Sequence, residues 1–514
     1  MTSSAHQDER RPLLQGSPTR GEHDGAPLRS VDGSNGPWRR FLQLLPFLLM
    51  FTAVEVGASL LSIAESQIIE GVVCRKYYPD VFESSVDPRC KNEDVQSELS
   101  MLQGWELPFA LVPGLLTTIP YGIVADKYGR KLVLILSLIG VALSQFVDLV
   151  VCRFPDTFDI RLIWLGASMS VVGGGPFVFT AMMFTMASDI STEAQRSTTF
   201  FHLTAMAIAG QLVAAPLAFV AMARGEWFAA SVGFLCVPTA ILVAIASPET
   251  QRKGSAVHGE TTPQDDLPGT VAGKSSITWG ALRPKISNAV REAFGSIRCL
   301  FWENKRLGLL LLTFLFTTLG RYVSIIQMQY VTKRFSWSWS QAGLLSSITA
   351  GMNLILVVSI LPFASRVLLG KMQLSPLFKD LWIARASIVA LVVGSFGIGI
   401  ANQSVLLLFS LAIYSLGAGY TPAMRSLLAL VAEDQHVGML FTALSVLENF
   451  GNLIAGPLMA TTFRIGLSWG EPWIGLPFIA AACLLACGAA IVFGVSFSRK
   501  DDKTKVVDDQ DEAA

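Results

Sequence analysis

Charged side chains are scarce in this chain. Only 15% of its 514 residues are Asp, Glu, Lys or Arg, whereas 52% are hydrophobic. The 39 acidic and 39 basic residues balance, so no net charge favours binding to a nucleic acid. The mean hydropathy of +0.50 is typical of membrane proteins. The composition therefore indicates a polytopic membrane protein and excludes a soluble enzyme or a nucleic-acid-binding protein.

Histidine and cysteine are also rare, and neither follows a metal-binding pattern. The chain has five histidines, and its seven cysteines lack the spacing of a zinc site. The phosphate-binding sequence GxxxxGK[ST] does not occur in the chain, so we do not expect ATP hydrolysis as an energy source. We therefore predict no metal, no cofactor and no enzymatic activity.

Twelve long apolar runs make up most of the chain. They lie at about 41–69, 101–125, 132–152, 161–188, 198–223, 227–247, 306–331, 340–367, 382–401, 404–430, 438–463 and 472–497. Each run is close to the ~20 residues that a helix needs to cross a bilayer. We therefore predict an all-α polytopic membrane protein with twelve transmembrane helices.

The polar segments around the runs define the expected domain organisation. The central segment and the C-terminal tail are rich in Lys and Arg, which places both in the cytoplasm. The polar first ~40 residues do not form a cleavable signal peptide, and apolar spacing at 284–304 predicts a helix on the membrane surface. The predicted parts are a disordered cytoplasmic tail at 1–40, a six-helix bundle at 41–247, a cytoplasmic loop at 248–305, a second six-helix bundle at 306–497 and a cytoplasmic tail at 498–514.

An internal repeat relates the two bundles. Gly210 and Pro216 in the fifth run have the same spacing as Gly451 and Pro457 in the eleventh. The fourth and tenth runs each contain a glycine-rich stretch followed by a proline. Such repeats are typical of transporters built from two related halves, so we predict two pseudo-symmetric six-helix bundles.

A polar hairpin joins the second and third runs, and reads Gly122-Ile-Val-Ala-Asp126-Lys-Tyr-Gly129-Arg130-Lys131. Gly122 allows another helix to approach closely, and Gly129 permits a tight turn. Asp126 can accept hydrogen bonds from a helix N-terminus, and the two bases favour the cytoplasmic side. At every defined position the stretch resembles motif A of the major facilitator superfamily, Gly-x-x-x-Asp-x-x-Gly-Arg-Arg/Lys. The resemblance implies a latch between the two halves, with a plain positive-inside hairpin as the alternative.

Further stretches resemble a narrower group within that superfamily. The segment around Pro216 is partly similar to its antiporter motif, which favours export. The first outer loop, from Cys74-Arg-Lys-Tyr-Tyr to Arg-Cys90-Lys, resembles fungal efflux-type permeases, which are distantly similar to proton-coupled folate and tetracycline-type carriers.

The resemblance implies a secondary active transporter for proton-driven efflux of a small organic compound, such as a secondary metabolite or toxin. Proton-coupled uptake of a nutrient or vitamin is one alternative, and a transporter-like membrane receptor is another. The implied partners are the small-molecule substrate, protons and the lipid bilayer. The implied state is a monomer that crosses the cell membrane, or a vacuolar or vesicle membrane, several times.

Ionisable residues within the runs are costly in a membrane, and each is therefore a functional candidate. Glu55 lies deep in the first run, on a polar stripe that includes Ser59 and Ser62. Arg321 lies equally deep in the seventh run. Glu55 is a candidate proton carrier or substrate contact, and a static Glu55–Arg321 ion pair is the alternative. Asp148, near the end of the third run, is expected at the membrane interface.

The remaining polar candidates have two interpretations each. Glu448 in the eleventh run is a proton-coupling candidate or a buried structural group. Gln211, Gln327 and Asn452 are candidates for the substrate cavity, with hydrogen bonding between helices as the alternative.

Two features concern the segments expected outside the cytoplasm. Cys74 and Cys90 can form a disulfide if the loop at 70–100 lies there, or remain free thiols. Asn402 begins the sequon Asn-Gln-Ser and is a glycosylation candidate, although it lies close to the membrane.

Overall fold

The computed structural model describes residues 37–81, 87–190, 193–247, 305–431 and 437–495. The chain divides into two units, residues 1–43 and 44–514, and only the start of the first helix is described in the first unit. The fold and the site described here belong to the second unit. The predicted tails and central loop, including the surface helix at 284–304, lie almost entirely outside the described residues.

The described residues form helices and no strand. The α-helices are α1 (Pro37–Tyr77), α2 (Glu93–Tyr128), α3 (Arg130–Arg153), α4 (Ile163–Ser168), α5 (Gly175–Ile190), α6 (Glu193–Met222), α7 (Glu226–Ala246), α9 (Lys305–Arg321), α10 (Ser324–Arg334), α11 (Trp339–Ile355), α12 (Leu361–Arg366), α13 (Pro376–Gly399), α14 (Ser404–Leu416), α15 (Tyr420–Val431), α16 (Val437–Ser468) and α17 (Leu476–Gly494). Short 3₁₀ or π-helical segments are η1 (Pro88–Lys91), η2 (Ile160–Leu162), η3 (Met169–Val171), η4 (Leu356–Ile360), η5 (Val367–Lys371), η6 (Gly417–Gly419) and η8 (Glu471–Trp473).

The helices lie where the apolar runs predicted them. Eleven helical spans among the described residues are long and apolar enough to cross a membrane. The 32-residue α16 is a twelfth helix of sufficient length, and it carries the polar residues Glu448, Asn449 and Asn452. The chain is therefore an all-α polytopic membrane protein, as predicted.

Two of the predicted continuous helices are interrupted where glycines cluster. The run at 161–188 is divided by Gly173, Gly174 and Gly175, whose φ angles are 70°, 79° and 56°. A Cβ atom at Gly173 would lie 2.2 Å from the carbonyl oxygen of Leu136, so this turn against α3 requires glycine. The run at 404–430 is likewise interrupted by η6, which contains two glycines.

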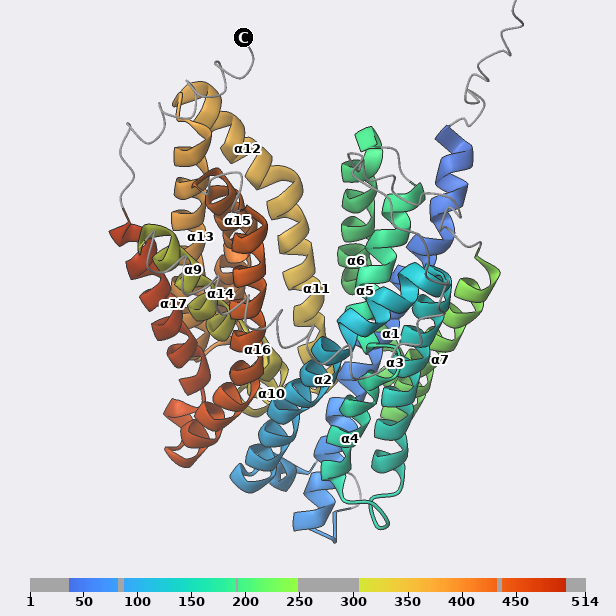
Figure 1. The fold of residues 1–514 in the computed structure, drawn as a ribbon. Coiled ribbons are helices and arrows are strands. Elements are labelled where there is room, and N and C mark those ends of the chain that lie inside the picture. The colour runs from blue at the N-terminus through green and yellow to red at the C-terminus, as the bar shows by residue number, and fades with distance from the viewer. Residues whose placement is uncertain (1–36, 82–86, 191–192, 248–304, 432–436, 496–514) are drawn as a thin grey trace, which may run out of the picture. The chain divides into compact units, whose positions relative to one another are not determined.

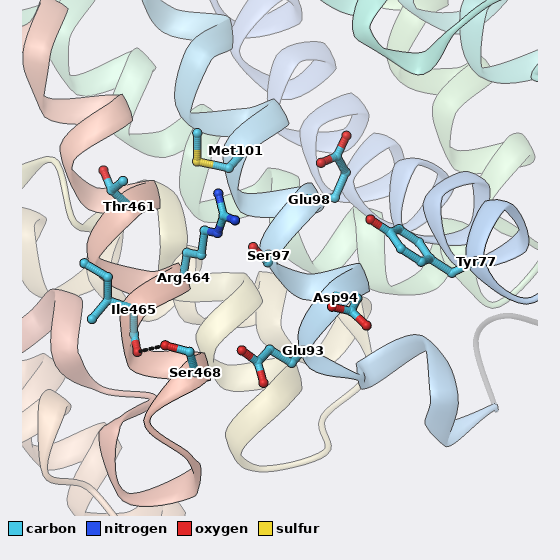
Figure 2. Close-up of a pocket in the computed structure, with 10 residues that line it drawn as sticks. All are labelled: Tyr77, Glu93, Asp94, Ser97, Glu98, Met101, Thr461, Arg464, Ile465 and Ser468. Carbon is cyan, nitrogen blue, oxygen red and sulfur yellow. Dashed lines mark hydrogen bonds between the residues drawn. The ribbon is translucent and has the colours of Figure 1, made fainter.

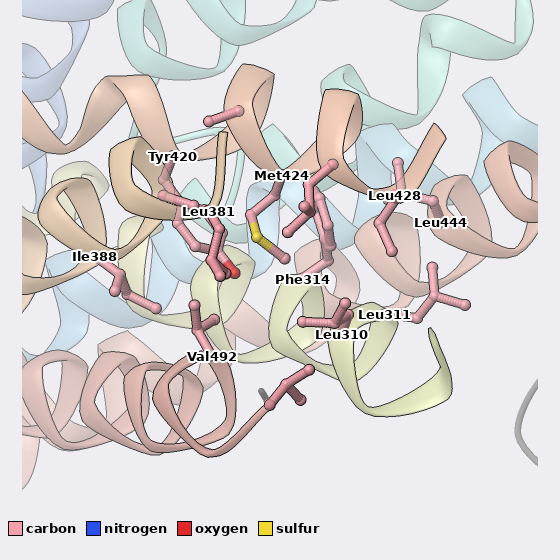
Figure 3. Packing of buried hydrophobic residues seen from close by; sticks show 14 of the residues in the cluster. Leu310, Leu311, Phe314, Leu381, Ile388, Tyr420, Met424, Leu428, Leu444 and Val492 are labelled. Carbon is pink, nitrogen blue, oxygen red and sulfur yellow. The ribbon is translucent and has the colours of Figure 1, made fainter. Parts of the chain in front are cut away.

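The second half of the chain has a continuous apolar core. Phe314 of α9, Ile388 of α13, Met424 of α15 and Val492 of α17 are all at most 2% exposed. Figure 3 shows these side chains converging from four different helices. The burial of these large apolar side chains stabilises the packing of α9, α13, α15 and α17 against each other.

The first seven helices contact the later ones most extensively at two helix pairs. A Cβ at Gly456 of α16 would lie 2.2 Å from the carbonyl oxygen of Gly104 in α2, so the two backbones touch. In the second pair, the Ser347 hydroxyl of α11 donates to the carbonyl oxygen of Leu212 in α6, at 2.7 Å. Figure 1 shows α2 beside α16 and α11 facing α6. Small residues allow this approach, as is usual between membrane helices.

The connection between α1 and α2 contains a disulfide. Cys74 at the end of α1 is bonded to Cys90 in η1, and both side chains are fully buried. Arg89 beside it donates hydrogen bonds to Asp80 and Asp87, each at 2.8 Å, and these bonds lower the pKa of both carboxyl groups. The structure thus has the bridged alternative rather than the free thiols.

We predict that alkylation without reduction leaves Cys74 and Cys90 unmodified in the folded protein, as measured by mass spectrometry. Replacing both with alanine should lower the free energy of unfolding by about 3 kcal/mol, because the bridge restricts the unfolded chain by closing a loop of about 15 residues. The exposed residue Cys487 offers the control, since Cys487→Ala should change little. Alkylation of both loop cysteines before reduction would contradict the bridge.

Candidate functional site

The helical unit has two ends, which we call the disulfide end and the hairpin end. The disulfide end carries Cys74 and Cys90, and the hairpin end carries the residues from Gly122 to Lys131. Trp339, the first residue of α11, lies at the disulfide end because it contacts Glu70 of α1 there.

A buried carboxylate closes the disulfide end. Glu70 is only 2% exposed, and its two oxygens accept three hydrogen bonds. Oε1 accepts from Lys91 Nζ at 2.6 Å and from Gln96 Nε2 at 2.5 Å. Oε2 accepts from the indole nitrogen of Trp339 at 2.7 Å. One side chain of α1 therefore connects η1 and α2 with α11.

A second layer of hydrogen bonds supports Glu70. Gln329 of α10 donates to the backbone carbonyl of Gln96 at 2.7 Å and to its Oε1 at 3.0 Å. Lys333 donates to the backbone carbonyl of Lys91, whose ammonium group lies 5.3 Å from the centre of the Trp339 ring. Gln96 and Gln329 are fully buried. These residues form the Glu70 network, which the sequence analysis did not predict.

A cavity of about 670 Å³ lies directly inside this network. Trp339 forms part of its wall, so the same side chain closes the end and lines the cavity. The other walls come mainly from α1, α2, α3, α5 and α10. A cavity of this size between membrane helices can hold a small organic molecule.

The charge of the cavity wall is entirely acidic. In the described part of the chain four carboxyl side chains line it and no Lys or Arg does; the four are Glu55, Glu65, Glu106 and Asp148. Of these four carboxyl groups, the sequence analysis identified only Glu55 as part of the cavity. It expected Asp148 at the membrane interface; in the structure Asp148 is 7% exposed and lines the cavity. The signal for Glu65 and Glu106 was their position within apolar helices.

Glu55 and Arg321 have separate partners. Gln211 Nε2 lies 3.5 Å from Glu55 Oε2, whereas Arg321 donates to the Thr421 hydroxyl at 2.9 Å. Among the described residues no ion pair joins Glu55 to Arg321. Arg321 ends α9, and Tyr322, the next residue, lines the cavity at the break before α10.

The other predicted site residues are spread over several places. Glu448 is paired with Arg425, whose Nη2 lies 2.9 Å from both carboxylate oxygens. Asn402 accepts a hydrogen bond from Arg334 at 2.6 Å. Of the predicted polar cavity residues, Ser62 lines the cavity. The residues that do not line it are Ser59, Gln211, Gln327 and Asn452.

The hairpin is the tight turn that the sequence predicted. Only Gly129, with a φ angle of 112°, separates α2 from α3. Arg130 is paired with Asp189 at the end of α5, and Lys131 donates to the carbonyl of Ile245 at 2.7 Å. Asp126 also makes an interaction. A Cβ at Gly122 would meet no atom within 4 Å, so no described helix approaches it in this conformation.

A second pocket, of about 580 Å³, lies between α2 and α16 at the disulfide end. Figure 2 shows Arg464 extending from α16 toward Glu98 and Ser97 of α2. Glu98 is already paired with Arg161, at 3.0 Å. The pocket is thus a polar recess beside the closed end, separate from the central cavity.

The Glu70 network should stabilise the protein strongly. We predict that Glu70→Ala lowers the free energy of unfolding by about 3 kcal/mol, because the Lys91 ammonium group, the buried Gln96 amide and the Trp339 indole lose their acceptor. Trp339→Phe removes only one donor and should cost about 1 kcal/mol. Glu226→Ala is the control, since Glu226 accepts a single 3.3 Å hydrogen bond from Gln67. Denaturant unfolding in detergent measures all three, and equal values for Glu70→Ala and Glu226→Ala would contradict the prediction.

Comparison with known proteins agrees with this geometry. The family model described as "Major Facilitator Superfamily" matches residues 95–378, more than half of the chain. The "Efflux pump ustT" of Aspergillus flavus is 30% identical over 427 residues, which are 82% of this chain and 82% of that protein. The "MFS efflux pump atnC" of Emericella nidulans is 29% identical over 467 residues, 88% of this chain and 87% of the relative.

Solved structures with the same fold are also transporters. A bacterial homologue of the human lysosomal transporter Spinster, in an inward-facing and unoccupied conformation, has a TM-score of 0.58 at 14% identity, covering 88% of this chain and 96% of that one. A variant of the nucleoside transporter NupG has a TM-score of 0.59 at 13% identity, covering 87% of this chain and 100% of that one. These two structures support the fold, whereas the family match and the fungal relatives show that the chain belongs to the major facilitator superfamily of membrane transporters.

Proposed function

We propose that this transporter exports a small organic compound, of the secondary metabolite or toxin type, in exchange for protons. The names of the fungal relatives support export, because both are efflux pumps. The observation that carries the proposal is the acidic cavity, which lies between the two groups of helices and is closed at one end by the Glu70 network. A cavity with one closed end is what alternating access requires of each of its states.

The disulfide end is the outer end in this proposal. A disulfide persists in an oxidising compartment, which favours the outside for Cys74 and Cys90. The hairpin end, with Arg130 and Lys131, is then cytoplasmic, in line with the distribution of basic residues. In this orientation the Glu70 network closes the cavity to the outside.

The hairpin is the complementary latch. The open space at Gly122 leaves room for a helix of the other half to approach when the cytoplasmic end closes. Arg130 and Asp189 keep the hairpin attached to α5 meanwhile. The two bundles, 41–247 and 306–497, are the moving bodies in this proposal, with the Glu70 network made in one state and the latch in the other.

Glu55 is the proposed proton carrier. It lines the cavity, and its only hydrogen-bond partner among the described residues is the neutral Gln211. Glu448, by contrast, already has the guanidinium of Arg425 beside it. A carboxyl group without a basic partner at this depth can change its protonation state when the cavity changes sides, so Glu55 suits the role better.

The proposal predicts substrate accumulation that depends on a pH gradient. Purified protein reconstituted in liposomes should accumulate some members of a panel of fungal secondary metabolites when the lumen is acidic. Collapsing the gradient with a protonophore should abolish accumulation. The same panel tested with the gradient reversed distinguishes export from uptake. Accumulation that ignores the gradient in both directions would contradict proton coupling.

Glu55→Gln should uncouple transport from protons. The amide keeps the shape of the side chain but cannot bind or release a proton, so gradient-driven accumulation should fall to background. Exchange of labelled for unlabelled substrate, which needs no net proton movement, should persist. Glu226→Gln is the matched control outside the cavity and should behave like the wild type. Full gradient dependence in Glu55→Gln would move the proton site to another carboxyl group.

A further inference from the structure

We propose that Glu65, Glu106 and Asp148 form a binding site for an organic cation, such as a protonated amine attached to an apolar body. The inference rests on the proposed transport function and names the charge of the substrate. The three carboxyl groups come from three different helices, α1, α2 and α3, and all line the same cavity near its closed end. We call them the carboxyl cluster.

Asp148 is held in place by the shape of its surroundings. It lies on Gly166 of α4, where a Cβ atom would be only 1.9 Å from Asp148 Oδ1. The side chain is 7% exposed, and Oδ1 is buried without a hydrogen-bond partner. The Oε1 atom of Gln145, one turn earlier on α3, is also buried and unpartnered and faces the same cavity. Asp148 also lines the cavity, so a cation with N–H groups bound there would lie beside this unpaired carboxyl group.

The carboxyl cluster differs from four other acids within the helices, each of which has a basic partner. Glu70 is paired with Lys91, Asp189 with Arg130, Asp380 with Lys379 and Glu448 with Arg425. Among the described residues no Lys, Arg or His lines the cavity, and the other titratable groups near the cluster are Glu55, Tyr322 and Cys152. A buried carboxylate needs a cation or a proton, so the missing positive charge must come from outside the protein.

The surroundings favour an organic cation over a metal ion. No group of three or more His, Cys, Asp or Glu in the described parts of the chain could hold a metal. The cavity wall also includes the aromatic rings of Phe179, Tyr322 and Trp339. Aromatic faces attract organic cations and pack well against an apolar body. Protons and the amine would compete for the same carboxylates, which couples binding of the substrate to release of protons.

Three adamantane derivatives of one shape test the charge directly. Binding of 1-aminoadamantane, 1-adamantanol and adamantane-1-carboxylate to the full-length protein in nanodiscs is measured by calorimetry, with empty nanodiscs subtracted. We expect the amine to bind at least about tenfold more tightly than the alcohol, and the carboxylate to bind least. Acidification should weaken amine binding and leave alcohol binding unchanged. Equal affinity for the amine and the alcohol would overturn the proposal.

Substitutions in the carboxyl cluster test whether the amine binds there. Asp148→Asn, Glu65→Gln and Glu106→Gln should each weaken amine binding about tenfold or more and leave alcohol binding unchanged. Glu226→Gln, outside the cavity, should bind the amine like the wild type. If a variant does not fold, the pH dependence of amine binding by the wild type decides. If neutral compounds are transported in response to the gradient and the amine is not preferred, the cation site is overturned but the transport function is not. If the amine binds but no compound is transported, the transport function is overturned but the cation site is not.

Discussion

The buried carboxylate of Glu70 is the interaction on which the arrangement of the site depends. It connects α1, η1 and α2 to the beginning of α11, and Trp339 is both its partner and part of the cavity wall. A buried charge of this kind is tolerated because both of its oxygens accept hydrogen bonds and Lys91 compensates it. Since the partners come from both halves of the chain, the same network closes one end of the cavity and sets the relative position of the helices that form it.

Charge compensation separates the structural acids from the functional ones. Glu70 and Glu448 have a Lys or Arg from another helical element beside them, and Asp380 has Lys379 of its own helix, so each of these charges is compensated locally. The four acids of the cavity have no base in the cavity wall. In a low-dielectric environment a carboxylate beside a base is already compensated, whereas the carboxylates that line the cavity are the groups we propose for binding a proton or a cationic group.

Much of the fold and part of the site could be predicted from the sequence. The helices follow the apolar runs closely, and Gly129 forms the sharp turn expected between α2 and α3. The breaks at Gly173 and η6 were missed, because hydropathy reports the length of a run and not its continuity. Glu55 was identified as a cavity residue by the sequence analysis because it lies on a polar stripe of the first apolar run. Glu65, Glu106 and Asp148 were not, because each lies on a different helix and only their convergence makes them a group.

The sequence by itself determined that the chain crosses the membrane repeatedly, where most helices lie, and to which superfamily its hairpin is similar. These properties depend on local hydropathy and on short motifs with fixed spacing. Only the tertiary structure decided which polar residues meet. It separated Glu55 from Arg321, paired Glu448 with Arg425, and brought Glu70 to Trp339, 269 positions away. The physical reason is that an apolar helix presents lipid-facing, neighbour-facing and cavity-facing sides of similar composition, and packing alone distinguishes them.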